Sequence, residues 1–190
     1  MLNSVAGSII FPSGPSERLT ENVKQKTFRN TTYCDTPGFQ WGDNTETGEA
    51  ISMLLKDGGR CKVLFIVNVW KTSAGGWITR EDNATMRLIL DAAPEIGPDF
   101  GVIVNCCSKK EIHDKKRFAK NIFHGIKAKH HHGSIHFVDF YPNLDDKENV
   151  LIEASKIQTL KDFLNKKVPV IKMTKNMSNN LKADKFNGKI

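Results

Sequence analysis

Two near-continuous runs of apolar residues, 61–69 and 100–106, constrain the fold of this chain most strongly. A strand that is apolar at consecutive positions must be buried on both faces, which is typical of a parallel sheet covered by helices. Between the two runs, Met86, Ile89 and Leu90 recur at helical spacing. The sequence therefore predicts an α/β fold with a mostly parallel sheet.

The rest of the chain continues this alternation of strands and helices. Thr79 is predicted to be the N-cap of a helix over residues 79–93, with Asp82 three residues later, and Pro94 marks its end. Residues 21–34 predict one or two strands exposed on one face, because polar and apolar residues alternate there. The remaining expected elements are a short helix at 47–55, a basic helix at 114–127, a strand at 135–140 and an amphipathic helix at 149–165.

Length and composition bound the domain organisation. The 190 residues suit one domain, and 39% hydrophobic residues are enough for a core. We expect this domain over residues 1–166 and a basic, disordered tail over 167–190, because the apolar period is lost after Pro169. No apolar run reaches the roughly 18–20 residues of a membrane span, and no signal peptide is visible. The cysteines are interpreted as reduced thiols of a cytoplasmic protein, and they are Cys34, Cys61, Cys106 and Cys107.

The formal net charge of +7 is unevenly distributed along the chain. Residues 165–190 contain seven lysines against one aspartate, and residues 109–129 contain eight lysines and arginines against two acids. Such segments either bind nucleic acid or anionic lipid, or form a solvated helix face and a tail. The aromatic pattern of RNA-binding modules is absent, so nucleic acid is the least favoured partner.

The string Asp35-Thr36-Pro37-Gly38 follows the exposed strand segment directly. An aspartate at a strand end can reach a Mg²⁺ ion, usually through water. A glycine three residues later lets its backbone N–H approach a terminal phosphate, because no side chain stands in the way. Asp-x-x-Gly alone is often a simple turn, but the longer string 32–39 is more specific.

A second candidate motif, Ser108-Lys109-Lys110-Glu111, follows the buried run 100–106. It is a degenerate form of Asn/Thr-Lys-x-Asp, in which the lysine stem packs on guanine and the carboxylate accepts hydrogen bonds from the guanine edge. The alternative is a solvated Lys/Glu turn. Thr20 lies in a loop rich in proline, glycine and serine, where a mobile threonine could close on Mg²⁺ and phosphate.

Together these segments resemble a P-loop GTPase G domain, and within that class the GIMAP (immune-associated nucleotide-binding) or septin-like group. The resemblance covers about residues 2–164 in element order, and its sharp part is the string 32–39. It implies a three-layer fold that binds GTP or GDP with Mg²⁺ and sometimes forms a homodimer through the nucleotide face. The residues that it implies are Thr20 and Asp35 for the metal, and Asp35, Thr36, Pro37, Gly38, Ser108, Lys109 and Glu111 for the nucleotide.

Two departures from the family pattern affect the expected activity. Phe39 stands where Ras-type enzymes have the glutamine that orients the attacking water, so no catalytic residue is assigned. No Gly-x-x-x-x-Gly-Lys-Ser/Thr loop occurs in the sequence, and residues 2–7 resemble the helix that follows that loop. We therefore expect a truncated G domain that lacks the phosphate-binding loop and the first strand, with weak or absent GTP hydrolysis.

The expected missing strand lies in the family between the strand at 27–34 and the strand at 61–69. Either these strands pair directly, or the chain is marginally stable, or its N-terminus is incomplete, which is the alternative that we favour. Three functions follow: an impaired guanine-nucleotide-binding domain, a pseudo-GTPase used as an interaction module, or a basic nucleic-acid-binding protein. The histidines at 130–132 and His136 suggest a metal site, but a solvated loop is the simpler interpretation.

Overall fold

The computed structural model describes residues 1–12, 23–36, 59–69, 79–107, 114–125, 134–139, 141 and 149–173. Its elements are α1 (Leu2–Ala6), β1 (Lys24–Phe28), β2 (Thr31–Asp35), β3 (Gly59–Cys61), β4 (Val63–Asn68), α3 (Arg80–Ala92), the 3₁₀ turn η1 (Pro94–Ile96), β5 (Phe100–Cys107), α5 (Lys115–Gly125), β6 (Ile135–Asp139), α6 (Ala154–Lys166) and β7 (Ile171–Met173). None of the helices in these ranges has the length and apolar character needed to cross a membrane.

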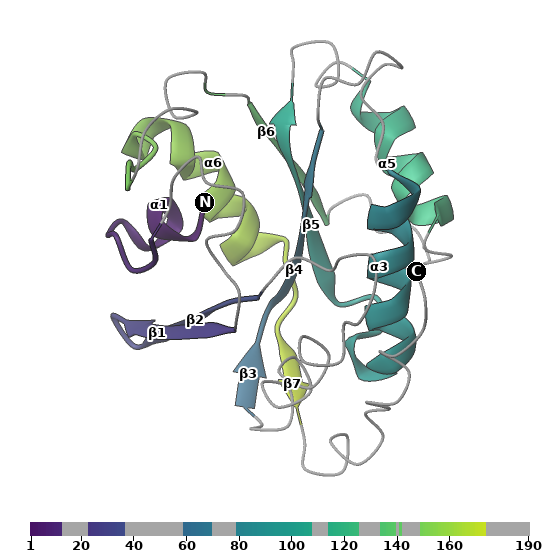
Figure 1. Cartoon of the computed structure of the whole chain (residues 1–190), viewed down its shortest axis with the longest axis horizontal. Coiled ribbons are helices and arrows are strands. Elements are labelled where there is room, and N and C mark those ends of the chain that lie inside the picture. The colour runs from purple at the N-terminus through teal and green to yellow at the C-terminus, as the bar shows by residue number, and fades with distance from the viewer. Residues whose placement is uncertain are drawn as a thin grey trace.

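A three-stranded parallel sheet in the order β4-β5-β6 forms the centre of the molecule. Helices α3 and α5 cover one face of this sheet, and α6 and α1 cover the other (Figure 1). The two apolar runs of the sequence become β4 and β5, which pair in register from Val63 opposite Phe100 to Asn68 opposite Asn105. The expected α/β class with a parallel sheet is confirmed. Strand β5 is buried on both faces, whereas β4 is buried mainly on one, since Ile66 on its other face is 45% exposed.

The core has two parts because the sheet separates them. Toward α3 and α5, Phe65, Val67 and Val104 pack with residues of both helices, including Met86 and Ile122. The second part lies toward α6, and its buried members are Ile103, Val138, Ile157, Leu160, Phe163 and Val168. The regular alternation of side chains along β4 and β5 therefore supplies apolar contacts to both helical layers.

The side chain of Asn3 organises the segment that follows α1. Its Oδ1 accepts hydrogen bonds from the backbone N–H groups of Ile10 and Phe11, both at 2.9 Å, and its Nδ2 donates to the Phe11 carbonyl at 2.7 Å. Ser4 Oγ accepts a hydrogen bond of 3.0 Å from the backbone N–H of Ile152, just before α6. A buried polar side chain with these partners is satisfied, so α1 is anchored to its own loop and to the α6 layer.

The N-terminus of α3 begins with the capping box that the sequence predicts. Thr79 Oγ1 accepts a 3.0 Å hydrogen bond from the Asp82 backbone N–H, and the Asp82 carboxylate accepts one of 3.2 Å from the Thr79 N–H. Replacing Thr79 with alanine should lower the free energy of unfolding by about 1 kcal/mol, because an N–H of the first turn loses its acceptor. Urea denaturation measures this loss. Thr79→Ser keeps the hydroxyl and should stay near wild type, and an equal loss in both variants would count against the capping role.

The packed domain extends past the boundary expected at residue 166. Val168 and Ile171 are buried, and β7 pairs antiparallel with β3, with Cys61 opposite Ile171. Residues 167–173 therefore belong to the domain and not to the tail. Their apolar side chains find partners on both core clusters, which a loss of local periodicity does not reveal. Residues 174–190 and the helix expected at 47–55 lie outside the described residues.

The predicted strand at 61–69 is divided at Lys62. Before it, β3 pairs with β7, and after it, β4 pairs with β5. Lys62 Nζ donates hydrogen bonds to the carbonyls of Leu164 and Asn165 at the end of α6. A cation at this position stabilises the helix C-terminus, where carbonyl groups lack partners within the helix. Burial lowers the pKa of the Lys62 ammonium.

Strands β1 and β2 form an antiparallel hairpin that is a sheet of its own, with Lys24 opposite Asp35. Within the described ranges, neither strand pairs with β4, so the structure does not show the direct pairing that was one alternative. Strand β4 is an edge of the parallel sheet in the part of the chain that the structure describes, and Ile66 on it is 45% exposed.

Candidate functional site

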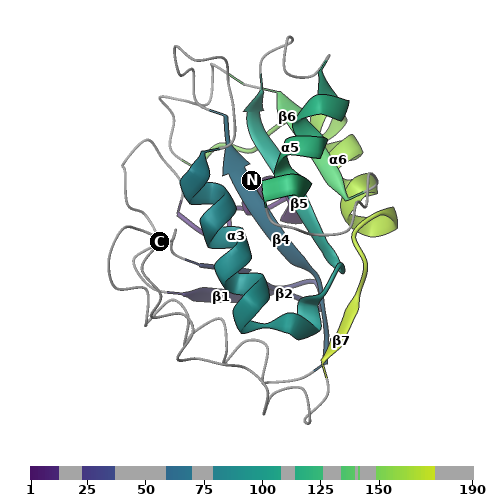
Figure 2. The ribbon, with the colours of Figure 1, turned by 90° about the vertical axis from the view of Figure 1, so that its right-hand side faces the viewer.

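Asp35 and Thr36 are the two nucleotide-site candidates that the structure describes. Asp35 ends β2 and is half-buried, and Thr36 follows it and is exposed. The β1–β2 hairpin lies beside the place where β3 passes into β4, in both Figure 1 and Figure 2. Asp35 is the last residue of this hairpin, and a carboxylate on a strand end could bind a cation.

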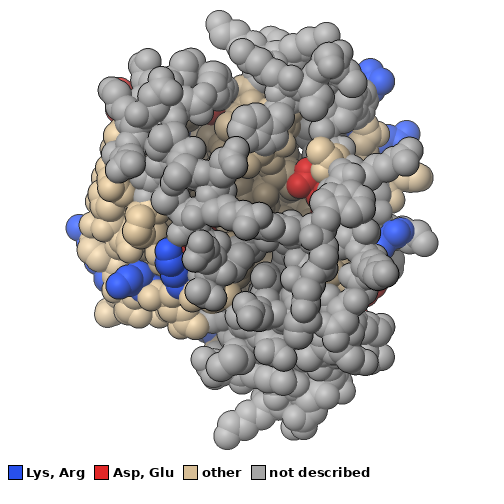
Figure 3. Space-filling model, viewed as in Figure 1, with Lys and Arg blue, Asp and Glu red and all other residues tan. Residues whose placement is uncertain are grey.

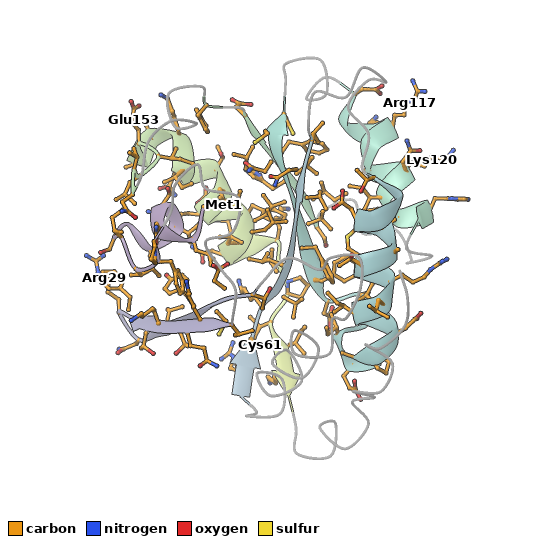
Figure 4. All side chains as sticks on the ribbon, in the orientation of Figure 1. Met1, Arg29, Cys61, Arg117, Lys120 and Glu153 are labelled. Atoms are coloured by element: carbon orange, nitrogen blue, oxygen red, sulfur yellow. The ribbon has the colours of Figure 1, made fainter. Side chains whose placement is uncertain are left out.

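The start of α1 also lies near Asp35. Burial lowers the pKa of the Met1 amino group, and the nearby Asp35 charge opposes this by raising it. Figure 4 shows Met1 in the middle of the molecule, between α1 and the sheet. The charge of Asp35 thus acts on the residue that precedes α1, although 34 positions separate Met1 from Asp35 in the sequence.

The carboxyl edge of the parallel sheet carries a second group of polar side chains. Asn105 Nδ2 donates a 2.9 Å hydrogen bond to Asn68 Oδ1, and this amide pair joins the last residue of β4 to β5. Cys106 next to it has a φ of 61°, and the pairing of β5 with β6 shifts register between Val104 and Cys107. A strained residue of this kind at the end of a central strand is typical of ligand sites in α/β proteins.

This amide pair is not among the site residues that the sequence predicts. A sequence signal for the pair was present, because both apolar runs contain the dipeptide Val-Asn near their carboxyl ends, at 67–68 and at 104–105.

Tyr141 follows β6 at the same edge of the sheet. Burial raises the pKa of the Tyr141 hydroxyl, and the charge of Asp139 raises it further.

Asp35 and the amide pair lie at opposite ends of β4. This strand has six residues, so at ~3.3 Å per residue its ends are ~17 Å apart. Ligands of α/β folds bind beyond the carboxyl ends of the parallel strands, and the structure places the amide pair there but not Asp35. The reason is that β2 pairs with β1 and is not held in the β4-β5-β6 sheet.

The other predicted site residues lie outside the described part of the chain, and they are Thr20, Pro37, Gly38, Ser108, Lys109 and Glu111. The histidines at 130–132 lie outside it as well, whereas His136 stacks on Phe163 with ring centroids 5.2 Å apart. In the described ranges, no group of three or more His, Cys, Asp or Glu side chains is arranged to hold a metal ion.

Basic side chains of the described residues lie apart in the view of Figure 3, over α5 on one side and over the β1–β2 hairpin on the other. On α5, Arg117 and Lys120 point outward (Figure 4). Arg117 forms an exposed ion pair of 3.8 Å with Asp114. Exposed pairs of this kind contribute little to stability, so the basic face of α5 is mainly a solvated surface.

Comparison of the sequence with models of known protein families and with curated proteins finds no match. The α/β class therefore rests on the strand pairing and on the two helical layers. A more specific assignment depends on the string 32–39 and on the surroundings of Asp35.

Proposed function

We propose that this chain is a guanine-nucleotide-binding domain of the P-loop GTPase type that binds GTP or GDP weakly, with Mg²⁺. The observation that carries the proposal is the position of Asp35 at the end of β2, directly before Thr36-Pro37-Gly38 in the sequence. In P-loop GTPases a strand-end aspartate and a Ser/Thr of the phosphate-binding loop hold the Mg²⁺ ion. A parallel sheet covered by helices on both faces supports the assignment.

Weak binding follows from the absence of the Gly-x-x-x-x-Gly-Lys-Ser/Thr motif from the 190 residues. In proteins that have this loop, its backbone N–H groups surround the phosphates and its lysine adds a positive charge. Asp35, Thr36 and Gly38 would supply only the remaining contacts. Phe39 in place of the water-orienting glutamine makes rapid GTP hydrolysis unexpected.

Titration with a fluorescent GTP analogue in the presence of Mg²⁺ tests this proposal. We expect no saturation at micromolar nucleotide, and binding in the millimolar range that EDTA weakens and that ATP does not reproduce. Saturation at micromolar GTP would refute the claim that the absent loop limits affinity. Equal binding of GTP and ATP would refute the guanine-nucleotide assignment itself.

The variant Asp35→Asn gives the residue-level test of the same proposal. Loss of the carboxylate should remove the Mg²⁺-dependent part of binding, because a neutral amide is a poor ligand for Mg²⁺. Asp91→Asn is the matched control, since Asp91 is an exposed residue of α3 and the substitution changes the net charge equally. If the two variants bind alike, Asp35 has no role in metal binding.

A second candidate is a pseudo-GTPase that acts as an interaction module, and the edge of β4 favours it. The strand is apolar from Val63 to Val67, carries no proline or charge, and leaves Ile66 exposed. Proline and charged side chains usually protect edge strands, and β4, an edge strand among the described residues, carries neither, so it suits the addition of a further strand. This candidate predicts a folded monomer or a defined complex whose melting temperature does not respond to GTP and Mg²⁺. A chain that cannot be purified folded would contradict it.

A further inference from the structure

Strand β4 offers backbone hydrogen-bonding groups on the side away from β5. The N–H and C=O groups of one residue in a strand point to the same side, and successive residues alternate between the two sides. The N–H of Val69, directly after β4, donates a 3.0 Å hydrogen bond to the Asn105 carbonyl of β5, which fixes this alternation. The backbone groups of Leu64, Ile66 and Asn68 therefore point away from β5.

These outward groups have no backbone partner among the described residues, where β4 is the outer strand of its sheet. The side chains of the same three residues lie on the face toward α6, since Leu64 packs against the cluster that contains Phe163. Ile66 is 45% exposed on this face, and Asn68 is exposed as well. Unpaired backbone groups beside an exposed isoleucine are a template for a further strand.

The character of β4 indicates which strand would fit there. All six of its residues are uncharged, although the chain has a formal net charge of +7. An acidic or basic segment would find no complementary charge on this strand, whereas an uncharged apolar strand would bury no unpaired charge. A strand that matches β4 in length and in character is β4 itself.

We propose that two copies of this chain pair antiparallel through their β4 strands and form one continuous sheet, with three strands from each copy. This proposal rests on the interaction-module candidate and identifies its partner as a second copy. The two-fold axis runs perpendicular to the sheet, so each face of one copy continues into the same face of the other. Residues that stand opposite each other must therefore have their side chains on the same face.

The register of this pairing follows from the backbone and from the exposed side chain together. An axis at Ile66 places Ile66 opposite Ile66 of the partner subunit, and Leu64 opposite Asn68 of the partner subunit. All three outward-pointing residues then form hydrogen-bonded pairs. The two isoleucine side chains cover each other on the face toward α6, and such apolar cross-strand pairs stabilise antiparallel strands.

Sedimentation velocity of the full chain, without nucleotide and over a range of concentrations, tests the proposal. We expect a monomer–dimer equilibrium that shifts toward the dimer as salt is added, because salt screens the repulsion between two chains of net charge +7. A monomer from the micromolar to the millimolar range would overturn the proposal, and so would a dimer that salt dissociates. A monomer that bound a different protein would support the interaction module and still overturn the pairing of two copies.

The variant Ile66→Lys tests the position of the contact. It removes the apolar pair and places two like charges opposite each other, so dimer formation should weaken by about tenfold or more. Val170→Lys is the matched control, because Val170 is 38% exposed and lies outside β4. This control should form the wild-type dimer. Equal weakening in both variants, or an unchanged dimer in Ile66→Lys, would contradict the proposed contact.

A mixture of Ile66→Lys with Ile66→Glu gives the sharpest test of the two-fold axis. Each variant alone should be monomeric, since like charges meet at the axis. The mixture should form a one-to-one dimer, because lysine opposite glutamate on adjacent strands is an attractive pair. Misfolded variants would not recover on mixing, so recovery also excludes loss of the fold as the cause. A mixture that stays monomeric would refute the position of Ile66 on the axis.

Discussion

Replacement of Phe100 by alanine is expected to lower the free energy of unfolding by about 3–5 kcal/mol. Phe100 begins β5, is 1% exposed, and meets Phe65 of β4 edge to face with ring centroids 5.4 Å apart. The substitution removes a large, fully buried apolar side chain from the core, and a strand flanked by two others cannot collapse into the space. Urea denaturation followed by circular dichroism measures the loss.

The matched control for this prediction is Phe28→Ala. Phe28 is a half-buried residue of β1 that belongs to neither core cluster, and the Arg29 guanidinium stands over its ring. Its removal should cost distinctly less than removal of Phe100. If Phe100→Ala is too unstable to fold, Phe100→Leu should still fold, since it keeps most of the apolar volume. Equal losses at positions 100 and 28 would show that β5 is not the centre of the core.

A methyl group added at Gly101 is expected to lower the free energy of unfolding by about 1–3 kcal/mol. A Cβ atom at this position would stand 2.7 Å from Cγ2 of Val168 and 2.9 Å from Cδ2 of Leu64. Leu64 can turn its flexible end away, but the branched side chain of Val168 is stiff about its first torsion angle. Gly101 is therefore required by the close approach of β5 to the segment that follows α6.

The double variant Gly101→Ala with Val168→Ala tests the cause of this loss. Val168→Ala alone should be destabilising, because it leaves a space in the core beside Gly101. Together, the added methyl group enters the space that the smaller side chain leaves, so the combined loss should be smaller than the sum of the two single losses. Strict additivity would contradict the predicted contact. The same result would argue against the packing of residue 168 in the domain.

Most of the central fold could be predicted from the sequence. The helices expected at 79–93, 114–127 and 149–165 correspond to α3, α5 and α6, and the strand at 135–140 corresponds to β6. These predictions succeed because continuous apolar runs indicate buried strands, and apolar residues at helical spacing indicate a helix buried on one face. Both patterns can be recognised within a short stretch of sequence. Thr79 was predictable for the same reason, since a capping box involves only residues three positions apart.

The short strands β3 and β7 were not predicted, and the site was predicted only in part. Cys61 and Ile171 pair across 110 positions, and neither segment has a pattern long enough to signal a strand. Asp35 was identified by its motif, but its position beside the start of β4 was not. Asn68 and Asn105 were missed because an asparagine at a strand end is unremarkable until its partner on the next strand is known.

The sequence by itself determined that this chain builds a parallel sheet between helices, because near-continuous apolar runs such as 61–69 and 100–106 are typical of strands in a parallel sheet covered by helices. It also determined the chemistry that the string at 35–38 can offer. Only the tertiary structure decided that the β1–β2 hairpin is a separate sheet and that Asn105 pairs with Asn68 at the carboxyl end of β4. These features depend on contacts between residues far apart in the sequence, and the local pattern of residues does not predict such contacts.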